Sequence, residues 1–173
     1  IYMENKTIIK TFFTFIIIAG IYSCREKKET EVQVHTNEIS IFNYDNKHDL
    51  LEYNKLKLDE SHPNLLNPNV SKSDYNLVKK SWISLHQNIG KYLSDNEFKW
   101  GVKDSSITIF HKIYFNSNGE IENYAFNVLN KNVSKEKKEQ FANLISTYAN
   151  YIQLDFKKNE KFAQCGKTKY QNK

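Results

Sequence analysis

The sequence predicts an α+β fold, in which a small antiparallel sheet built on a central β-hairpin (about residues 105–129) is packed by two amphipathic helices (about 72–94 and 135–151). Apolar residues recur at helical spacing in both helical ranges, and the same tetrapeptide, Asn-Val-Ser-Lys, opens each of them. The hairpin is predicted by apolar residues that alternate with polar ones on both sides of Asn118–Gly119. These elements are expected to belong to one domain, residues 38–173.

Residues 1–23 have the pattern of a cleaved secretory signal. Lys6 and Lys10 precede a short apolar run, and a small residue, Ser23, ends it. The run is shorter than the ~20 apolar residues that a spanning helix needs. An uncleaved membrane anchor and a buried N-terminal helix are the alternatives, and the second is disfavoured because only Thr11 and Thr14 interrupt the run.

The end of this signal, Ile21-Tyr22-Ser23-Cys24, resembles the lipobox of bacterial lipoproteins. The resemblance implies that Cys24 is lipidated, with palmitate as a typical acyl chain, and becomes the new N-terminus. The membrane would then be a partner through this lipid, and several acyl chains would make the anchor stable. Arg25 stands where an aspartate would be associated with inner-membrane retention, so the outer membrane is the expected location in the cell envelope. Residues 24–37 are polar and aperiodic, which predicts a flexible tether.

Composition excludes one class of partner and one kind of stabilisation. The net charge is +5, but it is spread through mixed runs such as residues 135–139 and forms no basic stripe. Nucleic-acid binding requires clustered Lys and Arg on one face, so no nucleic-acid partner is expected. The chain has two cysteines. If Cys24 carries lipid, Cys165 has no partner for a disulfide.

The first half of the domain gives weak signals. Residues 38–44 alternate in part and predict a first strand or an extended arm. Residues 49–58 have a moderate helical pattern without a clear stripe, and two prolines mark residues 61–69 as a loop.

From residue 70 the signals are stronger. Ser71 is expected to cap the first amphipathic helix and Ser134 the second. In the strand that begins near residue 105, alternation places four apolar residues on one face and the intervening residues on the other. Residues 154–170 predict one or two short strands around a turn near 157–161, with Gly166 at a bulge or a close backbone approach. The four apolar residues are Ile107, Ile109, Ile113 and Phe115; Thr108, Phe110, Lys112 and Tyr114 face the other way.

The order helix, strand, Asn-Gly turn, strand, helix and short strand over residues 71–170 resembles the C-terminal domain of TonB-type energy transducers. The closest local match is the hairpin segment Lys-Ile-Tyr-Phe-Asn-Ser-Asn-Gly-Glu-Ile-Glu at 112–122. The resemblance implies a similar fold and, as one functional alternative, a strand-addition module. Two features depart from it: the tryptophan-and-proline segment expected after the second helix is absent, and an N-terminus cleaved at Cys24 cannot serve as a transducer's membrane helix.

The five histidines do not form a metal site, because none is spaced from a cysteine, a carboxylate or another histidine as zinc ligands are. We expect His35 and His62 to be solvated in loops, and His86 and His111 to be partly buried and satisfied by the fold. Glycine-rich phosphate loops, serine elbows and other cofactor motifs are absent from the sequence, so no cofactor is expected.

Two functional hypotheses remain. The first is a non-enzymatic, lipid-anchored binding or accessory protein that faces the periplasm or the cell exterior, with a protein, peptide or glycan as partner. Its candidate binding face consists of hairpin aromatic residues left open on the sheet; alternatively, residues 38–58 cover them. The second is a thiol-dependent enzyme in which His111 activates Cys165. The hairpin aromatic residues are Phe110, Tyr114, Tyr124 and Phe126.

Overall fold

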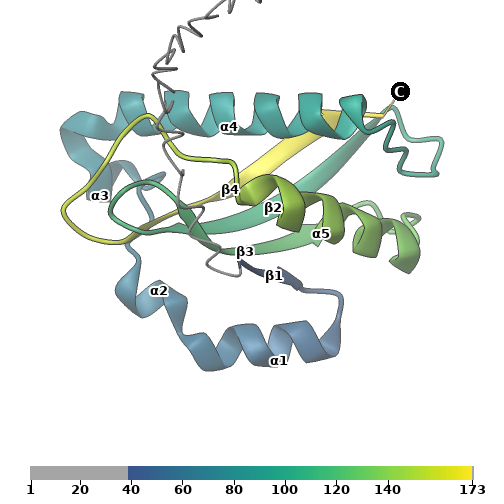
Figure 1. Cartoon of the computed structure of the whole chain (residues 1–173), viewed down its shortest axis with the longest axis horizontal. Helices are drawn as coiled ribbons and strands as arrows, with labels where there is room; N and C mark the ends of the chain where they lie inside the picture. The colour runs from purple at the N-terminus through teal and green to yellow at the C-terminus, as the bar shows by residue number, and fades with distance from the viewer. Residues whose placement is uncertain (1–38, 173) are drawn as a thin grey trace, which may run out of the picture. The chain divides into compact units, whose positions relative to one another are not determined.

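The structure is a computed structural model of the chain, and it describes residues 39–172, drawn in colour in Figure 1. These residues form helices on a small sheet, as predicted. The predicted signal, the candidate lipidation site Cys24 and the predicted tether lie outside the described residues.

The sheet has four strands in the order β1-β3-β2-β4. Strands β2 (Ser106–Phe115) and β3 (Ile121–Val128) form the predicted hairpin, and β4 (Phe162–Gln171) is antiparallel to β2. The sheet is mixed, because β1 (Ser40–Asn43) pairs with β3 in parallel. Parallel neighbours need a long crossover connection, and here several helices and β2 separate β1 from β3 along the chain.

The two predicted amphipathic helices are α4 (Tyr75–Asp95) and α5 (Lys135–Ala149). Ser134 caps α5 as predicted, accepting a hydrogen bond from the Lys137 N–H. Ser71 does not cap α4; instead it ends a short helix that Asn67 caps. The weaker pattern in the first half forms a helix as well. The remaining helices are α1 (Lys47–Leu56), α2 (Leu58–Ser61), α3 (Pro68–Ser71) and the 3₁₀ turn η1 (Lys72–Asp74).

Each face of the sheet is covered by helices (Figure 1). The larger core lies between the sheet and helices α4 and α5, and it includes Ile109 and Ile113 of β2 and Phe126 of β3. The smaller core lies on the opposite face, where Tyr53 of α1 and Leu58 of α2 pack against the sheet. The alternation predicted for β2 is therefore correct, and both of its faces are used.

Two glycines take the roles expected from the sequence. Gly119 has φ +83 in the hairpin turn, a conformation that favours glycine. Gly166 on β4 lies so close to α4 that a Cβ there would stand 3.1 Å from Cζ2 of Trp82. β4 differs from the prediction in being one continuous strand of ten residues.

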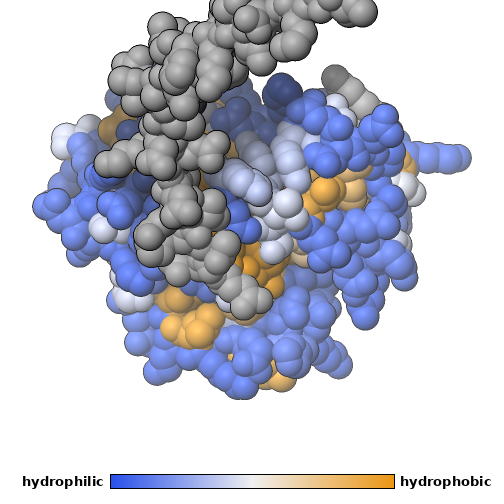
Figure 2. All heavy atoms as spheres, viewed as in Figure 1, coloured by the Kyte–Doolittle hydropathy of each residue, from blue (hydrophilic) through white to orange (hydrophobic). Residues whose placement is uncertain are grey.

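Exposed apolar side chains are scattered. On the face that Figure 2 shows, apolar residues form separate orange patches on a mostly blue surface. The most exposed large apolar side chains are Tyr151, Leu51 and Leu77. Single exposed apolar residues are normal on a folded protein and do not by themselves mark a binding surface.

Candidate functional site

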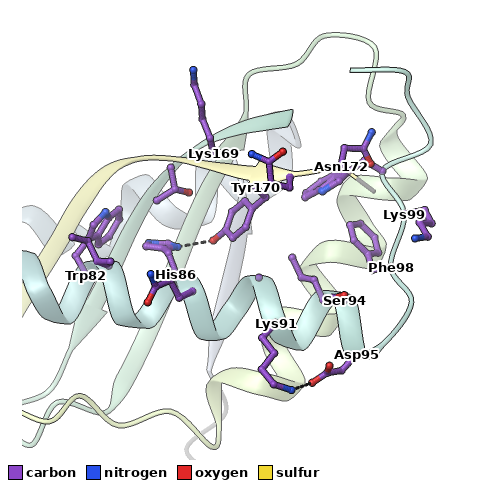
Figure 3. A pocket seen from close by; sticks show the side chains of 17 residues that line it. Trp82, His86, Lys91, Ser94, Asp95, Phe98, Lys99, Lys169, Tyr170 and Asn172 are labelled. Carbon is purple, nitrogen blue, oxygen red and sulfur yellow. Dashed lines mark hydrogen bonds and ion pairs between the residues drawn. The ribbon is translucent and has the colours of Figure 1, made fainter. Parts of the chain in front are cut away.

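A cavity of about 640 Å³ lies between α4 and the C-terminal half of β4. Figure 3 shows that Tyr170 of β4 points toward α4 and His86, whereas Lys169 points away from the helix. The loop that follows α4 completes the wall with Phe98, Lys99 and Trp100.

Four aromatic side chains, of which three are buried, lie in the wall: Trp82, Phe98, Trp100 and Tyr170. Phe98 packs edge-to-face on Trp100, with ring centroids 4.8 Å apart, and Trp100 packs on Phe141 of α5 at 5.2 Å. The chain has two tryptophans, and both Trp82 and Trp100 line the cavity. Ordinary ligand sites in proteins occupy about 300–1,000 Å³ and are lined largely by such residues.

His86 is the buried polar residue of the wall. Its Nδ1 lies 2.5 Å from the Tyr170 hydroxyl oxygen (Figure 3), and its Nε2 is buried without a hydrogen-bond partner in the part of the chain that the structure describes. Burial lowers the pKa of His86 to about 3, so the ring is neutral at pH 7. A phenol donates more readily than it accepts, so we assign the proton of the neutral ring to Nε2.

A second buried histidine, His111, lies against the first, with ring centroids 4.4 Å apart. It is satisfied on both sides: the Tyr124 hydroxyl lies 2.8 Å from Nδ1, and the Thr168 hydroxyl lies 2.8 Å from Nε2. Burial, together with the neighbouring His86, holds the pKa of His111 well below its usual value. Both histidines are buried, so the prediction of partial burial was wrong. The prediction that the fold satisfies them is confirmed for His111, whereas His86 is satisfied among the described residues at Nδ1 only.

His62 is buried, so the prediction of a solvated loop residue was wrong. Its ring packs edge-to-face on Tyr114 at 5.3 Å, and its Nδ1 lies 3.0 Å from the Leu58 carbonyl oxygen. The segment from α2 to α3 lies against β4 rather than in solvent, as a backbone hydrogen bond from Leu65 N–H to the Ala163 carbonyl shows. His35 lies outside the described residues.

Gly90 occupies the wall of the cavity in the middle of α4. A glycine inside a helix costs about 1 kcal/mol relative to alanine. Packing does not require it, because a Cβ there would stand 3.5 Å from Cδ1 of Tyr170, an ordinary contact distance.

The charges around the cavity are mainly positive. Lys91 is paired with Asp95 on α4, and Lys99 and Lys169 are exposed. Because Asp95 offsets Lys91, and because the Lys169 side chain points away from α4 (Figure 3), these charges give the cavity little preference for a ligand of either sign.

Next to the cavity, β4 presents a free sheet edge. Ala163 donates its N–H to the Pro63 carbonyl and accepts from the Leu65 N–H, so its backbone groups point away from β2. The register between β2 and β4 is unbroken, so every second residue after Ala163 points the same way. The next, Cys165, donates its N–H to Oδ1 of Asn64. Beyond it, within residues 39–172, no hydrogen bond reaches the outward backbone groups of Lys167, Lys169 and Gln171.

The four hairpin aromatic residues do not form one open face, so the predicted binding face is wrong in that form. Tyr124 and Phe126 are fully buried under α4 and α5. Tyr114 is fully buried on the opposite face, where α1 and α2 cover it, and Phe110 is half-buried on that same side. The physical reason is the pairing: Tyr124 is opposite Ile113, so it shares the face of Ile113 and not that of Tyr114. The alternative, that residues 38–58 cover the aromatic residues, is confirmed for Tyr114 but not for Tyr124 and Phe126, which lie in the core of α4 and α5.

Cys165 and His111 do not meet. Cys165 is opposite Lys112 in the register, so its side chain lies on the other face of the sheet from His111. Burial raises the pKa of the Cys165 thiol to about 12, so the thiol stays protonated at neutral pH. The proposed activation of Cys165 by His111 is therefore wrong.

The described residues hold no group of three or more side chains suited to bind a metal ion. Within the same residues, no helix has the length and apolar character needed to cross a bilayer.

Sequence reasoning missed the cavity as a site. The helical stripe identified Trp82 as a core residue, and nothing local in the sequence brings Tyr170 to His86, 84 residues away. The signals that were present are Gly90 inside a strong helical pattern and His86 beside its apolar face.

No protein-family model matches the chain, and neither the curated proteins nor the solved structures contain a match.

Proposed function

We propose that this protein is a lipid-anchored binding protein of the bacterial cell envelope that holds an extended peptide segment of a partner along the free edge of β4. The observation that carries the proposal is the row of outward backbone groups at Lys167, Lys169 and Gln171, which have no partner in residues 39–172. An extended segment that adds as a fifth strand would satisfy them.

The charge of the edge selects the kind of peptide. Lys167 and Lys169 are exposed, and their side chains share the sheet face of Cys165. Lysines on an edge strand oppose pairing with a second copy of the same basic edge. They favour a peptide whose residues on that face are acidic.

The envelope location rests on the signal-like run and on Cys24 in the lipobox-like Ile21-Tyr22-Ser23-Cys24. A lipid at Cys24 followed by a polar stretch would leave the folded domain free to reach a partner near the membrane. Arg25 after the cysteine favours the outer membrane.

The edge is tested with a fluorescein-labelled peptide, acetyl-Glu-Val-Glu-Val-Glu-Val-amide, titrated with the full chain and followed by anisotropy. Lys169→Pro removes an outward N–H without touching the hydrogen bonds to β2, and proline is tolerated at such edge positions. We expect it to weaken binding at least tenfold. Lys169→Ala keeps the N–H and loses the charge, so we expect a smaller, salt-dependent loss.

A second measurement needs no protein variant. Methyl groups on alternate peptide nitrogens block one edge of the peptide and leave the other free. We expect one of the two methylation patterns to abolish binding and the other to preserve it. Equal binding of both patterns, or unchanged binding by a folded Lys169→Pro variant, would overturn the proposal.

The anchor is tested by labelling cells with radioactive palmitate. We expect label on the wild-type protein and none on Cys24→Ala, which should accumulate as an unprocessed precursor. Normal processing of Cys24→Ala would show that cleavage occurs elsewhere and would remove the lipid anchor from the proposal.

A further inference from the structure

We propose that the segment held along the free edge of β4 is the C-terminal end of the partner chain, with its terminal carboxylate beside Asn64 and Lys167. This inference rests on the proposed function, because it names the part of a partner that the edge takes. Three features lead to it: one end of the edge is closed, the closed end carries donors for an anion, and an antiparallel peptide ends there.

The chain itself closes one end of the edge. Residues 63–67 lie beside the first half of β4, where Asn64 and Ala163 form a parallel bridge. The Leu65 N–H donates to the Ala163 carbonyl at 2.8 Å, and the Cys165 N–H donates to Oδ1 of Asn64 at 3.1 Å. This segment therefore takes the place of a fifth strand as far as Cys165, and the pairing of an added peptide stops there.

The other end of the edge is open. The outward backbone groups of Lys167, Lys169 and Gln171 follow one another at every second residue, and Gln171 is the last residue of β4. Within residues 39–172, none of these outward groups has a hydrogen-bond partner. A peptide on this edge thus meets the chain's own segment at the Lys167 end only.

The closed end carries donors that suit an anion. Oδ1 of Asn64 accepts from the N–H of both Leu66 and Cys165, each at 3.1 Å, which fixes the orientation of the side-chain amide. Within residues 39–172, its Nδ2 donates no hydrogen bond. The next outward N–H along the strand is that of Lys167. Amide N–H groups and an ammonium group are suitable partners for a terminal carboxylate.

The side chain of Lys167 is exposed, and among the described residues it forms no ion pair. Its charge is therefore available to a ligand. A carboxylate held by the backbone N–H of Lys167 would lie close to this ammonium group and gain from the attraction.

The direction of the peptide decides which of its ends lies at the closed end. β4 runs from Phe162 to Gln171, so an antiparallel peptide has its C-terminus beside Lys167, whereas a parallel peptide has its N-terminus there. Antiparallel pairing is slightly more stable per residue. The parallel arrangement would also bring an N-terminal ammonium group next to the ammonium of Lys167, and like charges repel. Both effects favour the C-terminus.

The central test compares unlabelled peptides as competitors of the labelled probe, with the full chain and anisotropy as the readout. We expect acetyl-Glu-Val-Glu-Val-Glu-Val with a free carboxylate to bind at least fivefold more tightly than the same peptide as an amide. An amide with one further glutamate at its N-terminus has the charge of the free acid, and we expect it to bind more weakly than the acid. Equal affinity of acid and amide would overturn the inference.

Extended peptides test the direction. Six glycines added before the free-acid peptide leave its C-terminus in place, so we expect less than a twofold change in affinity. The same six glycines added after it move the carboxylate away from the closed end, so we expect binding at least fivefold weaker. The opposite ranking would show a parallel peptide and would contradict the inference.

Variants locate the carboxylate. Asn64→Asp keeps the oxygen that accepts two backbone N–H groups and replaces Nδ2 by a second, anionic oxygen. We expect the preference for the acid over the amide to fall at least threefold, whereas Asn88→Asp, which adds the same charge at an exposed position of α4, should leave it unchanged. Lys167→Gln should also lower this preference, and Lys169→Gln should weaken acid and amide alike. If Asn64→Asp does not fold, equal preferences in the two lysine variants would contradict the site.

The outcomes separate this inference from the proposed function. If only one methylation pattern binds, and acid and amide bind equally, the edge takes a peptide but not a chain terminus, and the inference alone fails. If neither acid nor amide binds, the proposed function fails as well.

Discussion

At the scale of single residues, the side chains that matter are buried polar groups of the sheet and α4. His111 is hydrogen-bonded through both nitrogens, whereas His86 is bonded through Nδ1 alone. A buried polar group is costly mainly when its partner is removed, whereas replacing both partners by apolar groups is nearly neutral. The His86–Tyr170 pair can therefore be tested as a unit.

Tyr170→Phe should leave both nitrogens of His86 without a partner and lower the free energy of unfolding by about 1–3 kcal/mol. Adding His86→Phe to that variant should recover most of the loss, because no unpaired polar atom remains, and the adjoining cavity gives room for the larger ring. Urea unfolding measures both values. A double variant less stable than Tyr170→Phe would show that the imidazole stabilises the core by other contacts.

Cys165 should resist modification in the folded protein. Burial raises the pKa of its thiol to about 12, so almost no thiolate is present at neutral pH. In a Cys24→Ser variant, where it is the single thiol, we expect Ellman's reagent to react slowly until urea is added. Rapid labelling of the native protein at pH 7 would reopen the thiol-enzyme hypothesis.

At the scale of elements, α4 both packs on the sheet and lines the cavity. Its apolar face packs on the sheet through Val78, Leu85 and Ile89, while its C-terminal half forms the wall of the cavity. Gly90 lines the cavity within this helix, at a position where alanine would make the helix more stable.

Gly90→Ala should raise the free energy of unfolding by about 0.5–1 kcal/mol, because it removes the backbone entropy cost of a helical glycine and its Cβ makes an ordinary contact with Tyr170. Thermal unfolding gives the measurement, and Asn88→Ala on the same helix is a reference for an ordinary substitution. A loss of stability in Gly90→Ala would show that the close packing of α4 on Tyr170 requires glycine.

At the scale of the whole molecule, two neutral histidines lie side by side in the core. Burial lowers the pKa of His86 to about 3 and that of His111 well below its usual 6.5. Below pH 6.5 the unfolded chain binds protons at these residues and the folded protein does not. Stability is therefore complete above pH 6.5 and is lost as the pH falls toward the folded-state values.

Between pH 7.5 and pH 5, the free energy of unfolding should fall by up to about 4 kcal/mol, since each histidine contributes up to about 1.4 kcal/mol per pH unit. Urea unfolding at both pH values measures the change. The double variant His86→Phe and Tyr170→Phe should lose about half as much. Equal pH dependence in the wild-type protein and the double variant would assign the effect to other groups.

Much of the fold follows from local patterns. The stripes predicted α4 and α5, the Asn118–Gly119 turn predicted the hairpin, and alternation predicted which β2 side chains share a face. The candidate site did not follow. β4 has a free edge because it pairs with β2 on one side only, and no local pattern shows which strands will pair. The other edge strand, β1, comes from the beginning of the described residues and pairs with β3 in parallel.

The sequence by itself determined the secondary structure of residues 70–150 and the two faces of the hairpin, because these depend on periodicities within a dozen neighbouring residues. It also carries the signal-like run and Cys24, from which the envelope location is proposed. Only the tertiary structure separated Tyr114 from Tyr124, placed Cys165 on the opposite face from His111, and enclosed the cavity at Gly90. These outcomes depend on pairing and packing between distant segments, such as His86 with Tyr170, and no local pattern specifies them.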